Sequence, residues 1–137
     1  MSSVVVVDAS VVVQGCLEAT GFAPFAHVDL VGPRLLLSEA LSSLHELVWR
    51  GEISPELADS ALDRLRGAPF EVRDPEGLVD AAWQLAESLG WAKTYDAEYV
   101  ALARMLDCPL VTIDARLARG AGRVVRIIGP GELGSLS

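Results

Sequence analysis

The chain alternates short runs of strand-forming residues with longer segments of helical character. The first run, residues 4–7, is four consecutive valines, as expected of a strand that is covered on both faces. Such alternation favours a parallel sheet between helices. The sequence therefore predicts an α/β protein of three layers, α/β/α, with a central, mainly parallel five-stranded sheet. The other strands are expected at residues 35–37, 70–72, 110–113 and 124–128.

Helices are expected between these strands, and a loop is expected at residues 21–33. Ser54 precedes Pro55, a pattern typical of a helix start, and Gly51 and Gly90 each end a helical segment. Ser10 is a candidate cap for the first helix. A length of 137 residues suits one domain, so residues 1–137 are predicted to form a single domain. The expected helices cover residues 11–19, 38–50, 55–66, 75–89 and 96–106.

Four carboxylates lie where an apolar strand ends or where a helix begins. In an open α/β sheet these positions fall along one edge, so the side chains can meet in one acidic pocket. Unit charges ~4 Å apart repel by about 4 kcal/mol at an effective dielectric near 20, so such a cluster requires a cation. The four residues are Asp8, Glu39, Asp96 and Asp114.

Magnesium is the expected cation. Mg²⁺ prefers oxygen ligands and keeps several waters, whereas zinc sites usually contain paired His or Cys ligands, which this chain lacks. His45-Glu46 begins like the zinc motif HExxH, but Trp49 stands where the second histidine belongs. Each acid taken alone also has an ordinary explanation as a helix cap or a turn residue.

Two hydroxyl residues accompany the acids. Ser10 lies two residues after Asp8, and Thr112 lies two residues before Asp114. On a strand, residues two apart share a face, so either hydroxyl could position a metal-bound water. A role as a helix cap is the alternative for both.

The net charge of −8 argues against a general nucleic-acid-binding surface. Arginines nevertheless crowd one stretch next to Asp114, and Arg116 and Arg119 are candidate contacts for a phosphate backbone. A solvated basic face is the competing interpretation. The three tryptophans are expected in the core or in a subunit interface.

The cysteines, the apolar runs and the first residues indicate the cellular location of the protein. Cys16 and Cys108 are far apart in the chain, which fits reduced thiols in a cytoplasm better than a disulfide. No apolar run approaches ~18 residues, so no membrane span is expected. The first residues lack a basic region, so no secretory signal is expected either.

Several segments together resemble the PIN domain, specifically the VapC toxins of toxin–antitoxin pairs. They are VVVVDAS, LLLSEALSSLHELVWRGEIS, TYDAEYVALARMLDCPLVTID and the final strand. The resemblance covers nearly the whole chain. It departs at one point, because many relatives carry asparagine three residues after the glutamate, where this chain has Ser42 followed by Ser43.

The resemblance implies a single PIN domain in which Asp8, Glu39, Asp96 and Asp114 form the catalytic, metal-binding site. It implies a magnesium-dependent endoribonuclease, with Mn²⁺ as an alternative ion, that cleaves RNA. It also implies a homodimer that is silenced by a cognate VapB-like antitoxin. Chemistry supports hydrolysis independently, because a carboxylate-held metal can activate water and stabilise developing phosphoryl charge.

Three other classes compete with this interpretation. A receiver-type signalling module needs a lysine after a late strand, but Lys93 precedes a helix. A phosphatase of the haloacid dehalogenase kind needs a second aspartate where Ser10 stands. A catalytically inactive PIN fold that only binds RNA or protein is the more serious alternative.

Overall fold

The computed structural model describes residues 3–136, which contain a five-stranded parallel sheet. The strand order is β3-β2-β1-β4-β5, and every neighbouring pair is parallel. The predicted central parallel sheet is therefore confirmed. The strands are β1 (Ser3–Val7), β2 (Val28–Gly32), β3 (Phe70–Val72), β4 (Leu110–Val111) and β5 (Ile127–Ile128).

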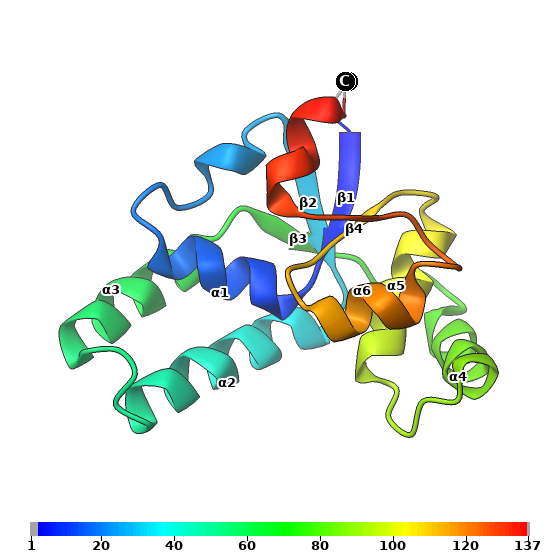
Figure 1. The fold of residues 1–137 in the computed structure, drawn as a ribbon, viewed down its shortest axis with the longest axis horizontal. Coiled ribbons are helices and arrows are strands. Elements are labelled where there is room, and N and C mark those ends of the chain that lie inside the picture. Colours follow the sequence, from blue (N-terminus) through cyan, green and yellow to red (C-terminus); the bar gives the residue numbers. More distant parts are fainter. Residues whose placement is uncertain (1–2, 137) are drawn as a thin grey trace.

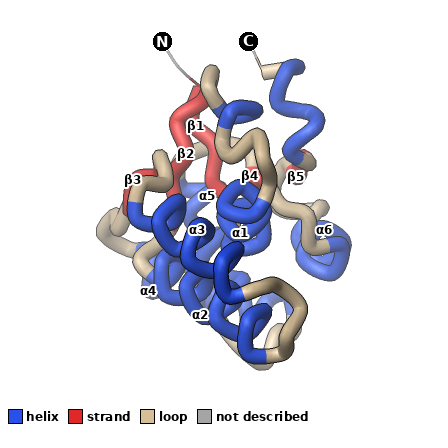
Figure 2. The backbone as a smooth tube through the Cα atoms, turned by 90° about the vertical axis from the view of Figure 1, so that its left-hand side faces the viewer, coloured by secondary structure: helices blue, strands red, loops and turns tan. Residues whose placement is uncertain are grey.

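Helices cover both faces of this sheet (Figures 1 and 2). On one side α1 (Ala9–Leu17), α2 (Leu35–Trp49) and α3 (Pro55–Arg66) pack against one another. On the other side α4 (Leu78–Leu89) packs on α5 (Tyr95–Met105), which contacts β1 and β4. The three-layer α/β/α arrangement is thus confirmed. The remaining helices are α6 (Ala115–Ala121) and the short 3₁₀ helices η1 (Ala23–Phe25) and η2 (Pro130–Ser135).

The first strand lies at the centre of the sheet because its side chains are apolar on both faces. Val5, Val6 and Val7 have no exposed surface, as predicted for a strand between two helical layers. Its neighbours are β2 on one side and β4 on the other. The chain therefore winds outward through β2 and β3, then returns to continue through β4 and β5. Such a reversal is the point where open α/β sheets bind ligands, beyond the carboxyl ends of the strands.

The prediction of a strand at residues 35–37 is wrong. The second strand is β2, inside the segment expected to be a loop, and Leu35 begins α2. The physical reason is that β-branched valines at positions 28 and 31 suit a strand, whereas three leucines after Pro33 suit a helix. Leu36 also packs against Gly32, where an added Cβ would lie 2.4 Å from its Cδ2 atom.

Several boundaries also differ from expectation. Helix α1 begins at Ala9 with Asp8 as its cap, so Ser10 lies inside the helix. Helix α4 begins at Leu78 after Gly77, whose positive φ of 91° interrupts the expected longer helix. Strands β4 and β5 have two residues each, and α6 was not expected at all. A helix this short carries too little periodicity to identify.

The three tryptophans, which were expected in the core or in a subunit interface, differ in their exposure. Trp49 is 81% exposed and Trp83 is 62% exposed, whereas Trp91 is partly buried against the core. Trp49 and Trp83 therefore lie outside the core, and a subunit interface stays the prediction for both. Across residues 3–136, no helix has both the length and the apolarity that a membrane span requires.

Candidate active site

All four predicted carboxylates line one pocket of about 350 Å³, here called the acidic pocket. Asp8 directly follows β1, and Asp114 follows β4 and caps α6. Glu39 lies in the second turn of α2, and Asp96 lies in the first turn of α5. Four distant segments therefore meet at the carboxyl edge of the sheet. The pocket is lined by Asp8, Ala9, Ser10, Glu39, Ser42, Ser43, Asp96, Tyr99 and Asp114.

Asp8 is the most rigidly held of the four. Its side chain is buried, and the Thr112 hydroxyl donates to its Oδ2 atom over 2.5 Å. The Ser10 hydroxyl donates to Oδ1 over 2.6 Å, and the Val11 amide donates to the same oxygen over 3.2 Å. Three donors on one carboxylate restrict its orientation and favour its charged form. The hydroxyls thus orient Asp8 itself, which is a contact that spacing alone did not specify.

Thr112 also connects Asp8 to Asp114. Its Oγ1 atom accepts a hydrogen bond from the Asp114 amide over 3.0 Å. The Asp114 carboxylate in turn accepts from the amides of Arg116 and Leu117, over 2.9 Å and 3.3 Å, and so caps α6. The cap and the pocket are therefore compatible roles for the same aspartate.

Tyr99 is a site residue that the sequence interpretation missed. Its hydroxyl donates to the Glu39 Oε1 atom over 2.5 Å, and its side chain is only 1% exposed. The spacing in the sequence could have identified it, because Tyr99 lies three residues after Asp96 and the two side chains therefore lie on the same face of α5. This contact fixes Glu39 from the opposite helical layer.

Burial raises the pKa of three of the four acids. For Asp8 the main cause is loss of water, and the nearby Asp114 charge adds to it. For Glu39 burial again leads, and the charges of Asp96 and Asp8 contribute in the same direction. For Asp96 burial and the Asp114 charge raise the pKa, against a smaller lowering by Arg116. The pocket therefore holds mutually repelling carboxylates that resist full ionisation.

These shifts predict a pH-dependent stability of the metal-free protein. A carboxyl group with a pKa raised by folding stabilises the fold fully below its unfolded pKa near 4, and this contribution is lost as pH rises through the raised value. We therefore expect the Asp96→Asn variant to gain stability over the parent as pH rises from about 4 to 7. Denaturant unfolding in EDTA across that range measures the difference. A difference independent of pH would contradict the interpretation.

The donor set fits magnesium. Within residues 3–136, none of the four carboxylates forms an ion pair with a protein cation, so their charge is not neutralised by the chain. No three His, Cys, Asp or Glu side chains of this described part are grouped so that they could hold one ion. Mg²⁺ commonly binds through one or two carboxylates and retains waters. The oxygen donors therefore fit an ion that keeps part of its water shell and is held by these carboxylates directly or through water.

A second pocket adjoins the first and contains the cations. It has a volume of about 610 Å³ and shares Glu39 and Asp96 with the acidic pocket. We call it the loop pocket, because the α4–α5 loop forms one wall. Arg116 lines it, as does Lys93, whereas Arg119 lines neither pocket. Its lining residues are Glu39, Gly90, Trp91, Ala92, Lys93, Tyr95, Asp96, Arg116 and Leu117.

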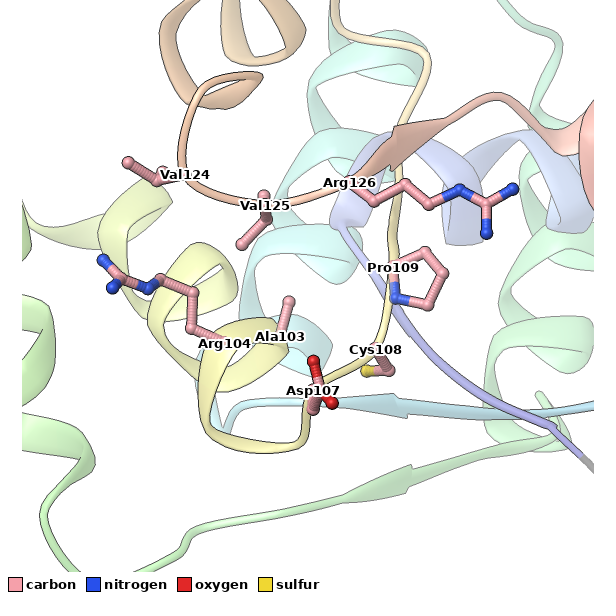
Figure 3. A pocket seen from close by; sticks show the side chains of 8 residues that line it. All are labelled: Ala103, Arg104, Asp107, Cys108, Pro109, Val124, Val125 and Arg126. Carbon is pink, nitrogen blue, oxygen red and sulfur yellow. The ribbon is translucent and has the colours of Figure 1, made fainter.

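A third hollow, of about 370 Å³, lies near the amino ends of β4 and β5, and Figure 3 shows its side chains. Its residues precede β4 and β5, and Arg104 and Arg126 extend in different directions (Figure 3). None of the predicted site residues lines it. It is thus separate from the acidic pocket. The lining residues are Ala103, Arg104, Asp107, Cys108, Pro109, Val124, Val125 and Arg126.

Comparison with known proteins places the chain in a family. A model of the PIN domain matches residues 5–123. Ribonuclease VapC1 of Mycobacterium tuberculosis is 43% identical over 94 residues, which span 66% of each chain. The VapC ribonuclease Mb0985 of Mycobacterium bovis is 34% identical over 115 residues, covering 83% of this chain and 88% of that protein.

A solved structure supports the fold. The crystal structure of PAE2754 from Pyrobaculum aerophilum superimposes with a TM-score of 0.72 at 22% sequence identity, covering 97% of this chain and 95% of the other. The receiver and phosphatase alternatives do not agree with these similarities. The chain belongs to the PIN domain family and, within it, to the VapC proteins.

Proposed function

We propose that this chain, acting as one PIN domain over residues 1–137, is an endoribonuclease that hydrolyses RNA phosphodiester bonds as the toxin of a VapBC-type module. The observation that carries the proposal is the meeting of four carboxylates from distant segments in one pocket. Similarity to proteins named as VapC ribonucleases supports RNA as the substrate. A bound cation reduces the repulsion between the four carboxylates, so their cluster is compatible with a stable fold.

The proposed cofactor is Mg²⁺, with Mn²⁺ as an alternative. Asp8 and Asp96 are the proposed principal ligands, and Glu39 and Asp114 complete the set directly or through water. When bound, the ion supplies polarisation of the phosphoryl group and a lower pKa for an attacking water. Supporting features are the oxygen-only donor set and the hydrogen bonds that orient Asp8.

The protein residues then have distinct roles. Thr112 and Ser10 hold Asp8 in one orientation through their hydroxyl groups. Burial raises the pKa of Glu39, and the Tyr99 hydroxyl fixes its carboxylate, so the group is positioned and basic enough to accept a proton from the attacking water. Arg116, close enough to Asp96 to lower its pKa, is placed to hold a phosphate oxygen.

The direct test is cleavage of total RNA by the purified protein with Mg²⁺ and with EDTA. We expect cleavage in Mg²⁺, and in Mn²⁺, and none in EDTA, because the reaction needs the cation. Binding of RNA without cleavage in either metal would instead support the catalytically inactive PIN module. Cleavage that persists unchanged in EDTA would contradict the metal-dependent mechanism.

The proposed partners are a VapB-like antitoxin and a second copy of this chain, and the proposed location is the cytoplasm. Loss of RNA cleavage on adding the antitoxin would test the first partner. The homodimer is supported by apolar side chains on α4, where Val79 and Trp83 are 80% and 62% exposed, and sedimentation of the purified protein tests it. Cys16 and Cys108 are free thiols, which supports a reducing compartment.

A further inference from the structure

We propose that the loop pocket holds an unstacked nucleotide of single-stranded RNA beside the scissile bond, with Tyr95 and Trp91 receiving the base and Lys93 and Arg116 binding the backbone phosphates. This inference rests on the proposed ribonuclease function and deepens it. It assigns binding roles to three residues, Trp91, Lys93 and Tyr95, that charge and spacing did not select.

The first argument is continuity with the acidic pocket. Glu39 and Asp96 line both hollows, so a strand lying in the loop pocket passes the carboxylates without leaving the protein surface. The volume of about 610 Å³ falls within the ~300–1,000 Å³ of typical ligand sites. In Figure 1 the α4–α5 loop lies next to α6, and these two segments supply most of the lining.

The second argument is the separation of charge. The acidic pocket is lined by no Lys or Arg, whereas the loop pocket has both Lys93 and Arg116. Both side chains are exposed, and neither forms an ion pair in the described part of the chain. Free cations next to a cluster of carboxylates attract the phosphates that the carboxylates alone would repel. Lys93 and Arg116 therefore attract the RNA backbone into the loop pocket. The next phosphate along the strand then lies at the acidic pocket.

The third argument is the aromatic surface. Tyr95 is 56% exposed although it opens a helix beside the site, and Trp91 lies partly buried against α6. Gly120 makes this seating possible, because an added Cβ there would lie 3.0 Å from the Trp91 Cζ2 atom. Exposed and well-seated rings are the platforms on which single-stranded bases stack, without strong sequence preference. Stacking requires unpaired bases, which selects single-stranded RNA over duplex.

The test is binding of a fluorescein-labelled single-stranded RNA to the full chain, followed by anisotropy in EDTA so that cleavage does not interfere. We expect Tyr95→Ala to weaken binding by about 5- to 150-fold, the range of one lost base stack, and Tyr95→Phe to restore it. Lys93→Gln should weaken binding and reduce the slope of log K against log salt by about 0.7.

Matched controls lie outside the loop pocket. Trp49→Ala removes an aromatic ring that is 81% exposed at the end of α2, and Arg50→Gln removes an exposed cation next to it that lines neither pocket. Neither should change RNA affinity. Equal binding by the parent, Tyr95→Ala and Lys93→Gln would overturn the proposal while leaving the ribonuclease function standing.

Two further outcomes separate this proposal from the function on which it rests. If the parent binds duplex as tightly as single-stranded RNA, the stacking site is wrong but a nuclease remains. If the parent neither binds nor cleaves RNA, the proposed function fails and the loop pocket assignment falls with it. Cleavage in Mg²⁺, measured in parallel, distinguishes these cases.

Discussion

The Asp96→Asn variant is expected to lose RNA cleavage by at least about 100-fold while keeping its fold. Residues that only orient a metal ligand typically change affinity or activity by about 10- to 100-fold, and Asp96 is proposed as a ligand itself. Asparagine has nearly the same size, so packing in the half-buried first turn of α5 is preserved. Rates of RNA cleavage in Mg²⁺ measure the loss, and circular dichroism checks the fold.

Asp80→Asn is the matched control for this substitution. Asp80 also lies in the first turn of a helix, α4, but it is exposed and lines neither pocket. The same change of charge and shape is made there without touching the acidic pocket. If Asp96→Asn cleaved RNA as fast as Asp80→Asn, the assignment of Asp96 would be incorrect.

The second large effect is expected at Thr112. Thr112→Val should lower the free energy of unfolding by about 1–3 kcal/mol, the range for leaving a buried polar group without its partner. The hydroxyl donates to the buried Asp8 carboxylate and accepts from the Asp114 amide, and valine can do neither. Urea unfolding measures the stability, and titration with Mn²⁺ measures whether Asp8 still serves the proposed ion.

Thr112→Ser separates hydrogen bonding from packing. Serine keeps the hydroxyl and loses one methyl group, worth about 0.8 kcal/mol of buried apolar surface, whereas valine keeps the volume and loses the hydroxyl. If hydrogen bonding governs the position, Thr112→Val is the less stable variant and binds the ion more weakly. A serine variant that is less stable than the valine variant would show that Thr112 acts mainly by packing.

The sequence predicted the first, central strand of the sheet better than the second one. Four valines could only be a buried strand, and Ser54-Pro55 marked the start of α3, where the Leu57 amide does bond the Ser54 hydroxyl over 3.1 Å. The second strand was placed at residues 35–37 because an apolar run of three residues has no usable periodicity. Only the packing identifies residues 35–37 as the start of a helix and not a strand, since Leu36 fills the space above Gly32.

The candidate site also has features that the sequence predicted and features that it did not. Parallel strands bring their carboxyl ends to one edge, so the position of acids after strands and at helix starts was enough to predict a shared acidic pocket. Spacing placed Tyr99 on the same face of α5 as Asp96 but did not identify its partner, because Glu39 comes from α2 in the opposite helical layer. The loop pocket likewise requires Trp91 to lie against Gly120.

Local order along the chain therefore determined the type of fold and the acids that gather at its edge, because both follow from strand and helix patterns that each segment carries itself. Tertiary structure decided which neighbours those acids have and where the cations lie. Thr112 reaches Asp8 across 104 residues, and Lys93 shares a pocket with Arg116 from a different element. Such partners depend on how helices pack over the sheet, which no single segment encodes.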